Sequence, residues 1–214
     1  MLVTILAQIG QLEAAEFSDQ IPFVVLTTAV CVHVPCSVGN HLFLPISVKV
    51  SSLWRKLDVG AIFVACALQT FAFTYFVLST NGTRVLTAMS ATVCILALRA
   101  VRKENYEAGE VNRRLNTVGV GFAALFYLFP IFYQMVLTNG GCVPLMASFG
   151  VLLSLGLGGL IFAISWPEKN SERMYDIVGQ SQQLMHGTLV IAHVFEMLFI
   201  LDSFYRMRGL QPVC

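Results

Sequence analysis

The chain has 214 residues, of which 57% are hydrophobic and only 12% charged, and its mean hydropathy is +0.75. A soluble globular domain carries about 25% charged and about 45–50% apolar residues, so this composition excludes a soluble domain and indicates a membrane protein. The formal net charge of +1 by itself indicates nothing about partners, and we expect no nucleic acid among them.

Six apolar runs are long enough to cross a membrane as helices. About 20 helical residues span the roughly 30 Å hydrocarbon core of a bilayer, and charged or Gly-, Pro- and Asn-containing breaks separate the runs. The predicted spans lie near residues 21–46, 58–79, 84–101, 115–137, 142–166 and 183–205. We therefore predict an all-α polytopic bundle in which residues 1–214 form a single transmembrane unit.

The distribution of Lys and Arg predicts the orientation of this bundle. Ten of the 13 cations lie in or beside the loops 47–57, 102–114 and 167–182, whereas Arg84, Arg206 and Arg208 lie on the opposite side. Because cytoplasmic loops are enriched in cations, we expect these three loops in the cytoplasm and the C-terminus outside or in the lumen. The glycosylation sequon Asn81-Gly-Thr83 is then expected in a lumenal loop.

Cysteines, small residues and prolines within the runs are expected to serve packing. The six Cys residues have no regular spacing, so we predict buried thiols and no disulfide framework. The small residues of 119–124 and 156–159 favour close contact between helices. Pro35 and Pro130 should kink their spans because proline has no N–H donor, and whether such kinks shape a cavity stays open.

Ionisable residues inside the spans are the candidates for a functional site, because each Asp, Lys or Arg costs about 2.5–3.5 kcal/mol to insert. Ser37 and His41 are four residues apart and share a face of the first span, as Gln182 and His186 do in the last. Asp58 opens the second span at the same depth. These side chains are therefore expected near the cytoplasmic surface of the bilayer.

Three further ionisable residues lie deeper in the spans. His193 and Glu196 are three residues apart on one helical face, and we expect them to bond each other or another helix. His33, eight residues before His41, is expected to serve packing or to support the site from behind.

The segments Ser37-Val-Gly-Asn-His41 and Ser181-Gln-Gln-Leu-Met-His186, with the 17-residue interval from His41 to Asp58, resemble the progestin and adipoQ receptor (PAQR) family. This family includes the adiponectin receptors and is related to bacterial haemolysin-III-like proteins. The similarity covers about residues 30 to 190, and residues 36–43 are especially similar to its Golgi-resident, Raf-trapping branch.

The resemblance implies a seven-helix bundle with a zinc ion held by three His, and a water between the metal and an Asp. On this chain His41, His186 and Gln182 take the ligand positions, Asp58 takes the position of the catalytic aspartate, and Ser37 lies behind the ligands. Gln182 departs from the family pattern, since a neutral amide binds zinc less well than imidazole or thiolate.

The beginning of the chain also departs from the family pattern. The resemblance implies a first helix before residue 20, and this chain contains only about the last ten residues of that helix. Residues 1–10 are apolar but lack the basic start of a signal peptide. The chain is therefore expected to be truncated, to have a misassigned start, or to be a six-helix derivative.

Three functions remain open at this stage. The first is a PAQR-type membrane receptor for a lipid or extracellular ligand, with an intact or degraded zinc site and a cytosolic signalling partner. The second is a zinc-dependent hydrolase of lipid amides such as ceramide, in which Asp58 deprotonates the metal-bound water. The third is a non-catalytic scaffold that tethers a cytosolic partner at an internal membrane. Independently of these functions, Asp58 could be a simple helix cap. Gln182 favours the two functions without catalysis, and the plasma membrane and the Golgi or endoplasmic reticulum are equally open.

Overall fold

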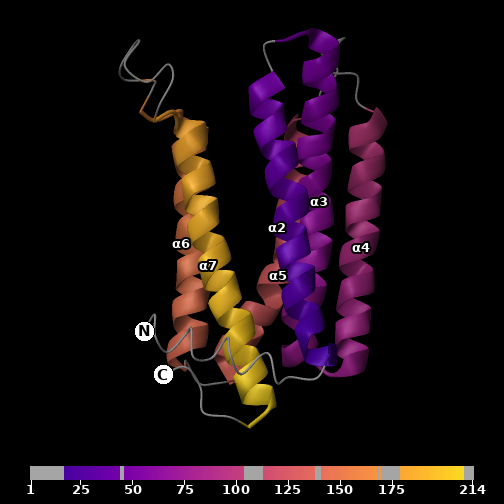
Figure 1. Cartoon of the computed structure of the whole chain (residues 1–214), viewed down its shortest axis with the longest axis vertical. Coiled ribbons are helices and arrows are strands. Elements are labelled where there is room, and N and C mark those ends of the chain that lie inside the picture. The colour runs from indigo at the N-terminus through magenta and orange to yellow at the C-terminus, as the bar shows by residue number, and fades with distance from the viewer. Residues whose placement is uncertain are drawn as a thin grey trace. The chain divides into compact units, whose positions relative to one another are not determined.

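The computed structural model describes residues 17–43, 46–103, 113–137, 141–167, 169 and 179–209. This part of the chain is built from six helices and contains no strand (Figure 1). The helices are α2 (Phe17–Phe43), α3 (Val48–Val77), α4 (Thr80–Lys103), α5 (Arg113–Leu137), α6 (Cys142–Ile164) and α7 (Ser181–Met207). Each contains a window apolar enough to cross a bilayer, so the prediction of six spans in an all-α membrane protein is confirmed.

The second helix begins ten residues earlier than the predicted start of its span. Ser47 is its N-cap, and the Ser47 hydroxyl accepts a hydrogen bond from the Val50 N–H at 3.3 Å. Most of the expected loop 47–57 is therefore the first three turns of α3. Hydropathy marks the part of a helix that lies in hydrocarbon, whereas the cap marks where the helix begins, and polar turns can extend a helix beyond the bilayer.

The sequon is also helical, contrary to its expected place in a loop. Residues 81–83 form part of the first turn of α4, and Thr83 is buried with its hydroxyl donating to the Thr74 carbonyl at 3.0 Å. This bond joins the start of α4 to the end of α3 across the short connection at residues 78 and 79. Thr83 thus has a structural role that the sequon pattern does not reveal.

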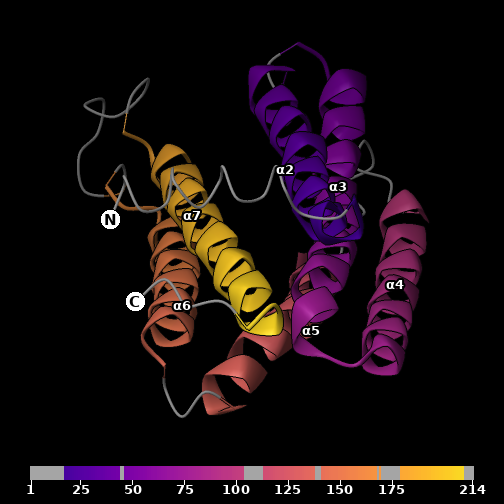
Figure 2. The same ribbon diagram turned by 60° about the horizontal axis from the view of Figure 1, so that its bottom comes forward.

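Residues 1–130 form the first of two compact units. Within it α3 packs against both α2 and α4, and α3 is the most buried of the described helices (Figures 1 and 2). Phe63 and Phe73 of α3 are fully buried, and the ring of Phe73 lies 6.0 Å from that of Tyr127 in α5. Gly119 of α5 lies against Phe63, so the first part of α5 also packs on α3.

Residues 131–214 form the second unit, in which α6 and α7 pack along each other. A Cβ atom at Gly150 would overlap the ring of Phe195, and one at Gly158 would overlap the Thr188 hydroxyl. Close packing was predicted for the small residues at 119–124 and 156–159. Gly119 and Gly158 do lie at helix contacts, whereas a Cβ at Gly121, Gly156 or Gly159 would meet open space. The boundary between the two units falls at Pro130, which lies inside α5. Pro35, the other proline expected to kink a span, lies inside α2.

The cysteines follow the prediction only in part. Cys66 and Cys94 are buried free thiols, as expected, but Cys31 is an exposed free thiol. Cys142, at the first position of α6, is disulfide-bonded, so the prediction of thiols throughout is wrong there. Cys214 lies outside the described residues.

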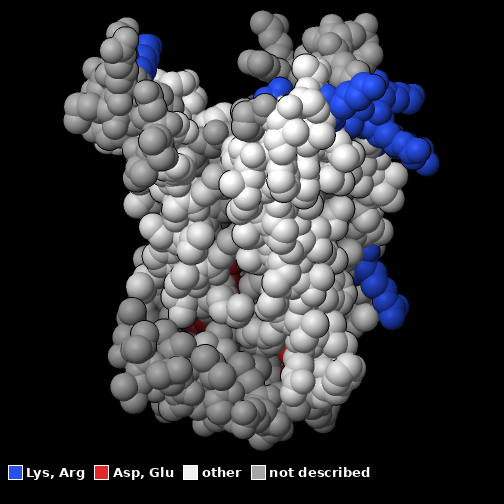
Figure 3. Space-filling view, turned by 45° about the horizontal axis from the view of Figure 1, so that its top comes forward, with Lys and Arg blue, Asp and Glu red and all other residues white. Residues whose placement is uncertain are grey.

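Charge is unevenly distributed over the described surface. In Figure 3 most of the Lys and Arg side chains in view on the first unit gather at one end of that unit, and little of the described Asp and Glu is visible. In the first unit this end carries the start of α3 and the end of α4, with Lys49, Arg55, Lys56, Arg99, Arg102 and Lys103. Among the described acidic residues, Asp19, Glu196 and Asp202 are buried and Asp58 is half-buried.

Candidate functional site

The last turns of α2 present Ser37, Asn40 and His41 toward the cation-rich end of the first unit. Ser37 and Asn40 are buried and His41 is half-buried. Gly39 allows the end of α2 to lie close to α3, because a Cβ atom at position 39 would overlap the ring of Trp54 in α3. The rings of Phe43 and Trp54, 4.8 Å apart, extend the same contact. The end of α2 is thereby fixed against the third turn of α3.

Asp58 lies one turn beyond Trp54 on the same face of α3. The Asn40 amide donates a hydrogen bond from Nδ2 to Asp58 Oδ2 at 2.9 Å. Because Ser47 caps α3 and Asp58 lies in its interior, the interpretation of Asp58 as a helix cap is wrong. Asp58 is instead a half-buried carboxylate that an amide from the neighbouring helix holds in place.

The Asn40–Asp58 pair leaves two acceptors open. Asn40 Oδ1 and Asp58 Oδ1 are both buried, and neither has a hydrogen-bond partner among the described residues. A buried acceptor without a donor costs about 1–3 kcal/mol, so each oxygen is suited to accept from a water or a ligand, or to face a cation.

The remaining predicted ligands lie in the second unit, at the start of α7. Gln182 occupies the first turn of α7, where only its backbone is described, and His186 is half-buried one turn later. The ligand set of His41, Gln182 and His186 thus draws on both units and stays a prediction. Among the described residues no three His, Cys, Asp or Glu side chains gather closely enough to hold a metal ion.

The chemistry of this donor set fits zinc incompletely. His41 and His186 supply two imidazoles, whereas a catalytic zinc site has three strong protein ligands and a water. The open Asp58 Oδ1 suits a metal-bound water, but the amide of Gln182 is a weak third ligand. We therefore derive no catalytic step from this set of residues.

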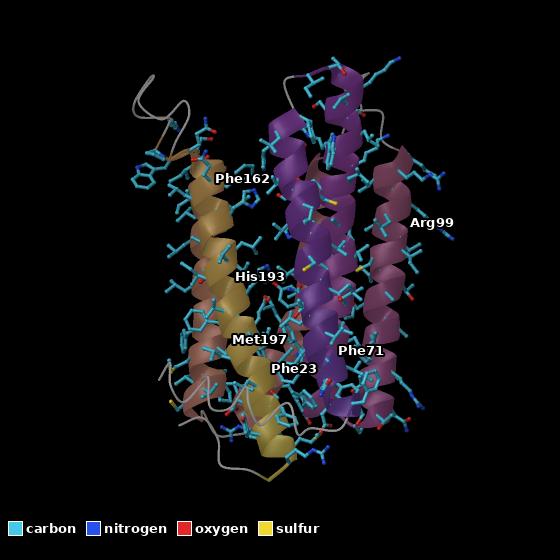
Figure 4. The ribbon with its side chains drawn as sticks, viewed as in Figure 1. Phe23, Phe71, Arg99, Phe162, His193 and Met197 are labelled. Atoms are coloured by element: carbon cyan, nitrogen blue, oxygen red, sulfur yellow. The ribbon has the colours of Figure 1, made fainter. Side chains whose placement is uncertain are left out.

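His193 and Glu196 form a pair in the middle of α7, which is the first of the two outcomes expected for them. His193 Nδ1 lies 2.7 Å from Glu196 Oε2. Glu196 is 1% exposed, and His193 Nε2 is buried with no hydrogen-bond partner among the described residues. Figure 4 shows His193 on α7 one turn before Met197. His33 of α2 is half-buried, and its expected role in packing or support stays a prediction.

A second buried polar network, near the end of α7, was not predicted. Asp202 Oδ2 accepts from Arg206 Nε at 2.6 Å and, more weakly, from Gln134 Nε2 of α5 at 3.5 Å. The Ser203 hydroxyl donates to Gln134 Oε1 at 2.8 Å and also to the Phe199 carbonyl at 2.7 Å. The signal in the sequence was Asp202 and Arg206, four residues apart at the end of an apolar run.

Asn40 was also overlooked as a site residue, although it lies inside the Ser37–His41 motif. No spacing rule connects position 40 to position 58, because the contact crosses from one helix to the next. Only the packing of Gly39 on Trp54 brings the two residues together.

The model of the family described as haemolysin-III related matches residues 1–197. Membrane progestin receptor delta of Mus musculus is 25% identical over 88% of this chain and 59% of the receptor, and the Homo sapiens protein gives the same three values. The chain thus spans about three fifths of the length of these relatives. The resemblance carried by the Ser37–His41 and Ser181–His186 motifs is confirmed, and the chain belongs to the haemolysin-III-related family of membrane proteins, which the PAQR receptors share.

Proposed function

We propose that the protein is an integral membrane receptor of the PAQR type, whose ligand is a progestin-like lipid. The observation that carries the proposal is the match to membrane progestin receptor delta over 88% of the chain. The structure supports it with hydrogen-bonding groups at membrane depth that have no partner among the described residues, such as Asp58 Oδ1 and His193 Nε2. Such groups are costly in hydrocarbon unless a ligand or water uses them.

The proposed orientation has the cation-rich end of the first unit in the cytoplasm and the C-terminus outside or in the lumen. Six cations at the start of α3 and the end of α4, against Arg84 at the opposite end, support this orientation. The disulfide-bonded Cys142 adds independent support, because it lies at the start of α6, opposite the predicted cytoplasmic loops. Disulfides persist in oxidising compartments. Plasma membrane and internal membranes both fit this orientation.

The direct test of the receptor is equilibrium binding of tritiated progesterone to the full chain in nanodiscs. We expect saturable binding that an excess of unlabelled progesterone displaces. Empty nanodiscs provide the control for partitioning of the steroid into lipid. Binding no greater than that of empty nanodiscs would refute the proposed ligand.

A zinc-dependent hydrolase of ceramide-like amides is the second candidate, and the Asn40–Asp58 pair is the observation that favours it. A carboxylate held by one oxygen, with the other oxygen open, is the arrangement needed to orient a metal-bound water. Elemental analysis of the purified protein tests the metal, beside His41→Ala and Gln182→His. Near-stoichiometric zinc that disappears in His41→Ala supports this candidate and justifies an assay of ceramide hydrolysis.

The opposite outcome of the zinc analysis is equally informative. Zinc that is absent from the natural protein but present in Gln182→His means that the site has degraded. A non-catalytic role, as a receptor or as a scaffold for a cytosolic partner, then stands alone. Progesterone binding separates these two roles.

A further inference from the structure

The uncharged part of α4 is shorter than the hydrocarbon that a spanning helix has to cross. Arg84 and Arg99 are the charged residues nearest the middle of α4, and residues 85–98 between them carry no charge. At 1.5 Å per residue the two arginines lie about 22 Å apart along the helix, against about 30 Å of hydrocarbon. The guanidinium groups therefore have to extend toward the lipid headgroups, or the bilayer has to thin so that the headgroups reach them.

At the end of α4 the charged residues form one face, which we call the α4 cationic face. Its members are Arg99, Arg102 and Lys103, three and four residues apart and all exposed. Ile95 and Leu96, which are 50% and 59% exposed, lie on the same side of the helix one turn nearer its middle. This surface thus changes from apolar to cationic within one turn, as the surroundings change from acyl chains to headgroups.

The opposite side of α4 packs into the first unit. Cys94 and Val101 are buried, and Leu98 lies against Gly60 of α3. These residues lie across the helix axis from the α4 cationic face. In Figure 4 the Arg99 side chain accordingly extends from α4 on the side away from α3. The cationic face is therefore a surface of the first unit and takes no part in the packing of α4 on α3.

No described carboxylate neutralises this face. Within the residues that the structure describes, none of its three cations forms an ion pair. Asp19 lies at the opposite end of the first unit, and Asp58 accepts a hydrogen bond from Asn40. In the sequence that follows α4, residues 104–114 contain three Glu and two Arg, so positive residues still outnumber negative ones in this part of the chain.

The neighbouring helix adds positive charge at the same level. The helices α3 and α4 are antiparallel neighbours joined by a short connection. About one turn beyond the contact of Gly60 with Leu98, their register brings Arg55 and Lys56 of α3 level with the α4 cationic face. Clustered cations raise the local concentration of anions, and several together favour an anion that carries more than one charge.

We infer that the α4 cationic face binds the headgroup of an anionic phospholipid that carries several phosphates, with the acyl chains of the lipid along Ile95 and Leu96. Guanidinium groups bind phosphate oxygens in pairs, and clusters of about four to eight cations beside a membrane span are typical of sites for polyanionic inositol lipids. The inference is independent of the ligand proposed for the receptor. The proposed cytoplasmic location of this end fits it, because anionic lipids are concentrated in the cytoplasmic leaflet.

The test is native mass spectrometry of the full chain in detergent, titrated with phosphatidylinositol bisphosphate. Phosphatidylserine and phosphatidylcholine are the comparison lipids. We expect one bisphosphate lipid to bind at concentrations at which the other two do not. Soluble inositol trisphosphate has the phosphates without acyl chains and should bind at least about tenfold more weakly, because it loses the apolar contact.

Single substitutions locate the site. Arg99→Gln should weaken binding of the bisphosphate lipid about fivefold, and Arg99→Lys less, since Lys retains the charge. Arg84→Gln, at the opposite end of α4, and Lys49→Gln, about two turns beyond the site on α3, each remove one exposed cation and should bind like the wild type. The variant with Gln at all three positions of the α4 cationic face should bind about a hundredfold more weakly. Circular dichroism and size-exclusion profiles verify that each variant folds.

Three outcomes would overturn the inference. The first is phosphatidylserine binding as tightly as the bisphosphate lipid, and the second is soluble trisphosphate doing so, which would make a free phosphate compound the ligand. The third is a loss in Arg84→Gln or Lys49→Gln equal to that in Arg99→Gln, because the binding would then depend on charge in general. No steroid is present in this test, so its result does not depend on whether the receptor proposal holds.

Discussion

Asn40 joins two helices through one hydrogen bond whose acceptor is a carboxylate in an apolar environment. Its amide donates to Asp58 at 2.9 Å, and the exposed fraction of Asn40 is 8%. A hydrogen bond to a charged acceptor contributes about 1.5–3 kcal/mol, roughly twice as much as one between neutral groups. The bond also fixes which oxygen of Asp58 remains open, which bears on both proposed functions.

Replacing Asn40 should therefore destabilise the protein and act through Asp58. We expect Asn40→Ala to lower the free energy of unfolding by about 1–3 kcal/mol, because Asp58 Oδ2 loses its donor. A double-mutant cycle with Asp58→Ala, followed by thermal or denaturant unfolding in detergent, should give a coupling energy of about 0.5–3 kcal/mol. Val38→Ala, at an exposed position of the same helix, is the control. Additive effects of the two substitutions would contradict the role assigned to Asn40.

Asp202 and Arg206 make the corresponding pair in the second unit, at a distance of 2.6 Å. Asp202 is fully buried and Arg206 is 30% exposed, so removing Arg206 and removing Asp202 have different consequences for stability. Arg206→Met leaves a buried carboxylate without its cation and should cost up to about 3 kcal/mol, less than a fully buried pair because solvent screens Arg206. Adding Asp202→Asn to Arg206→Met should restore part of the loss. Unfolding of both variants beside the wild type measures this, and a double variant no more stable than Arg206→Met would contradict it.

Helix pairs in both units are brought together by single glycines. In α6, Gly150 lies against the ring of Phe195, whereas Gly156 on the same helix faces open space. Without a hydrophobic drive between helices in lipid, such close approach depends on van der Waals contact over the small residue. A run of glycines in the sequence does not reveal which of them makes that contact.

The two glycines of α6 form a matched pair of test positions. Gly150→Ala should lower the stability of the protein by about 1–3 kcal/mol, because its methyl group would force apart the backbone of α6 and the ring of Phe195. Gly156→Ala should be neutral or slightly stabilising, since Ala favours helix. Melting temperatures of both variants in one detergent provide the comparison. Equal losses for the two would show that Gly150 does not lie at a tight contact.

The orientation of the whole molecule depends on charges at helix ends. Lys49, Arg55 and Lys56 occupy the first three turns of α3, at the end that we propose to be cytoplasmic. Neutralising all three to Gln should yield a mixture of orientations, because the bias that retains this end inside is removed. Labelling with a membrane-impermeant thiol reagent, at a cysteine introduced between residues 104 and 112, measures the fraction in each orientation. If the protein with the natural Lys49, Arg55 and Lys56 is labelled at that cysteine from outside, the proposed topology is reversed.

The sequence by itself determined the class, the number of spans and the location of charge. These follow from composition and from runs of apolar residues, which depend only on the thickness of hydrocarbon and the cost of inserting polar groups. The His193–Glu196 pair was also predictable, because both residues lie on one helix whose geometry is known in advance. The family was predicted from the resemblance of the Ser37–His41 and Ser181–His186 motifs, and the family match confirmed it.

Only the tertiary structure decided which residues meet across helices. The bond from Asn40 to Asp58, the network of Gln134 with Asp202 and Ser203, and the contact of Gly150 with Phe195 all join different helices. Helical periodicity gives the face on which a residue lies but neither the rotation nor the offset of the helix opposite, which depend on the packing of all side chains together. The start of α3 shows the same limit: a Ser47 hydroxyl, and not the hydropathy of the span, decides where the helix begins.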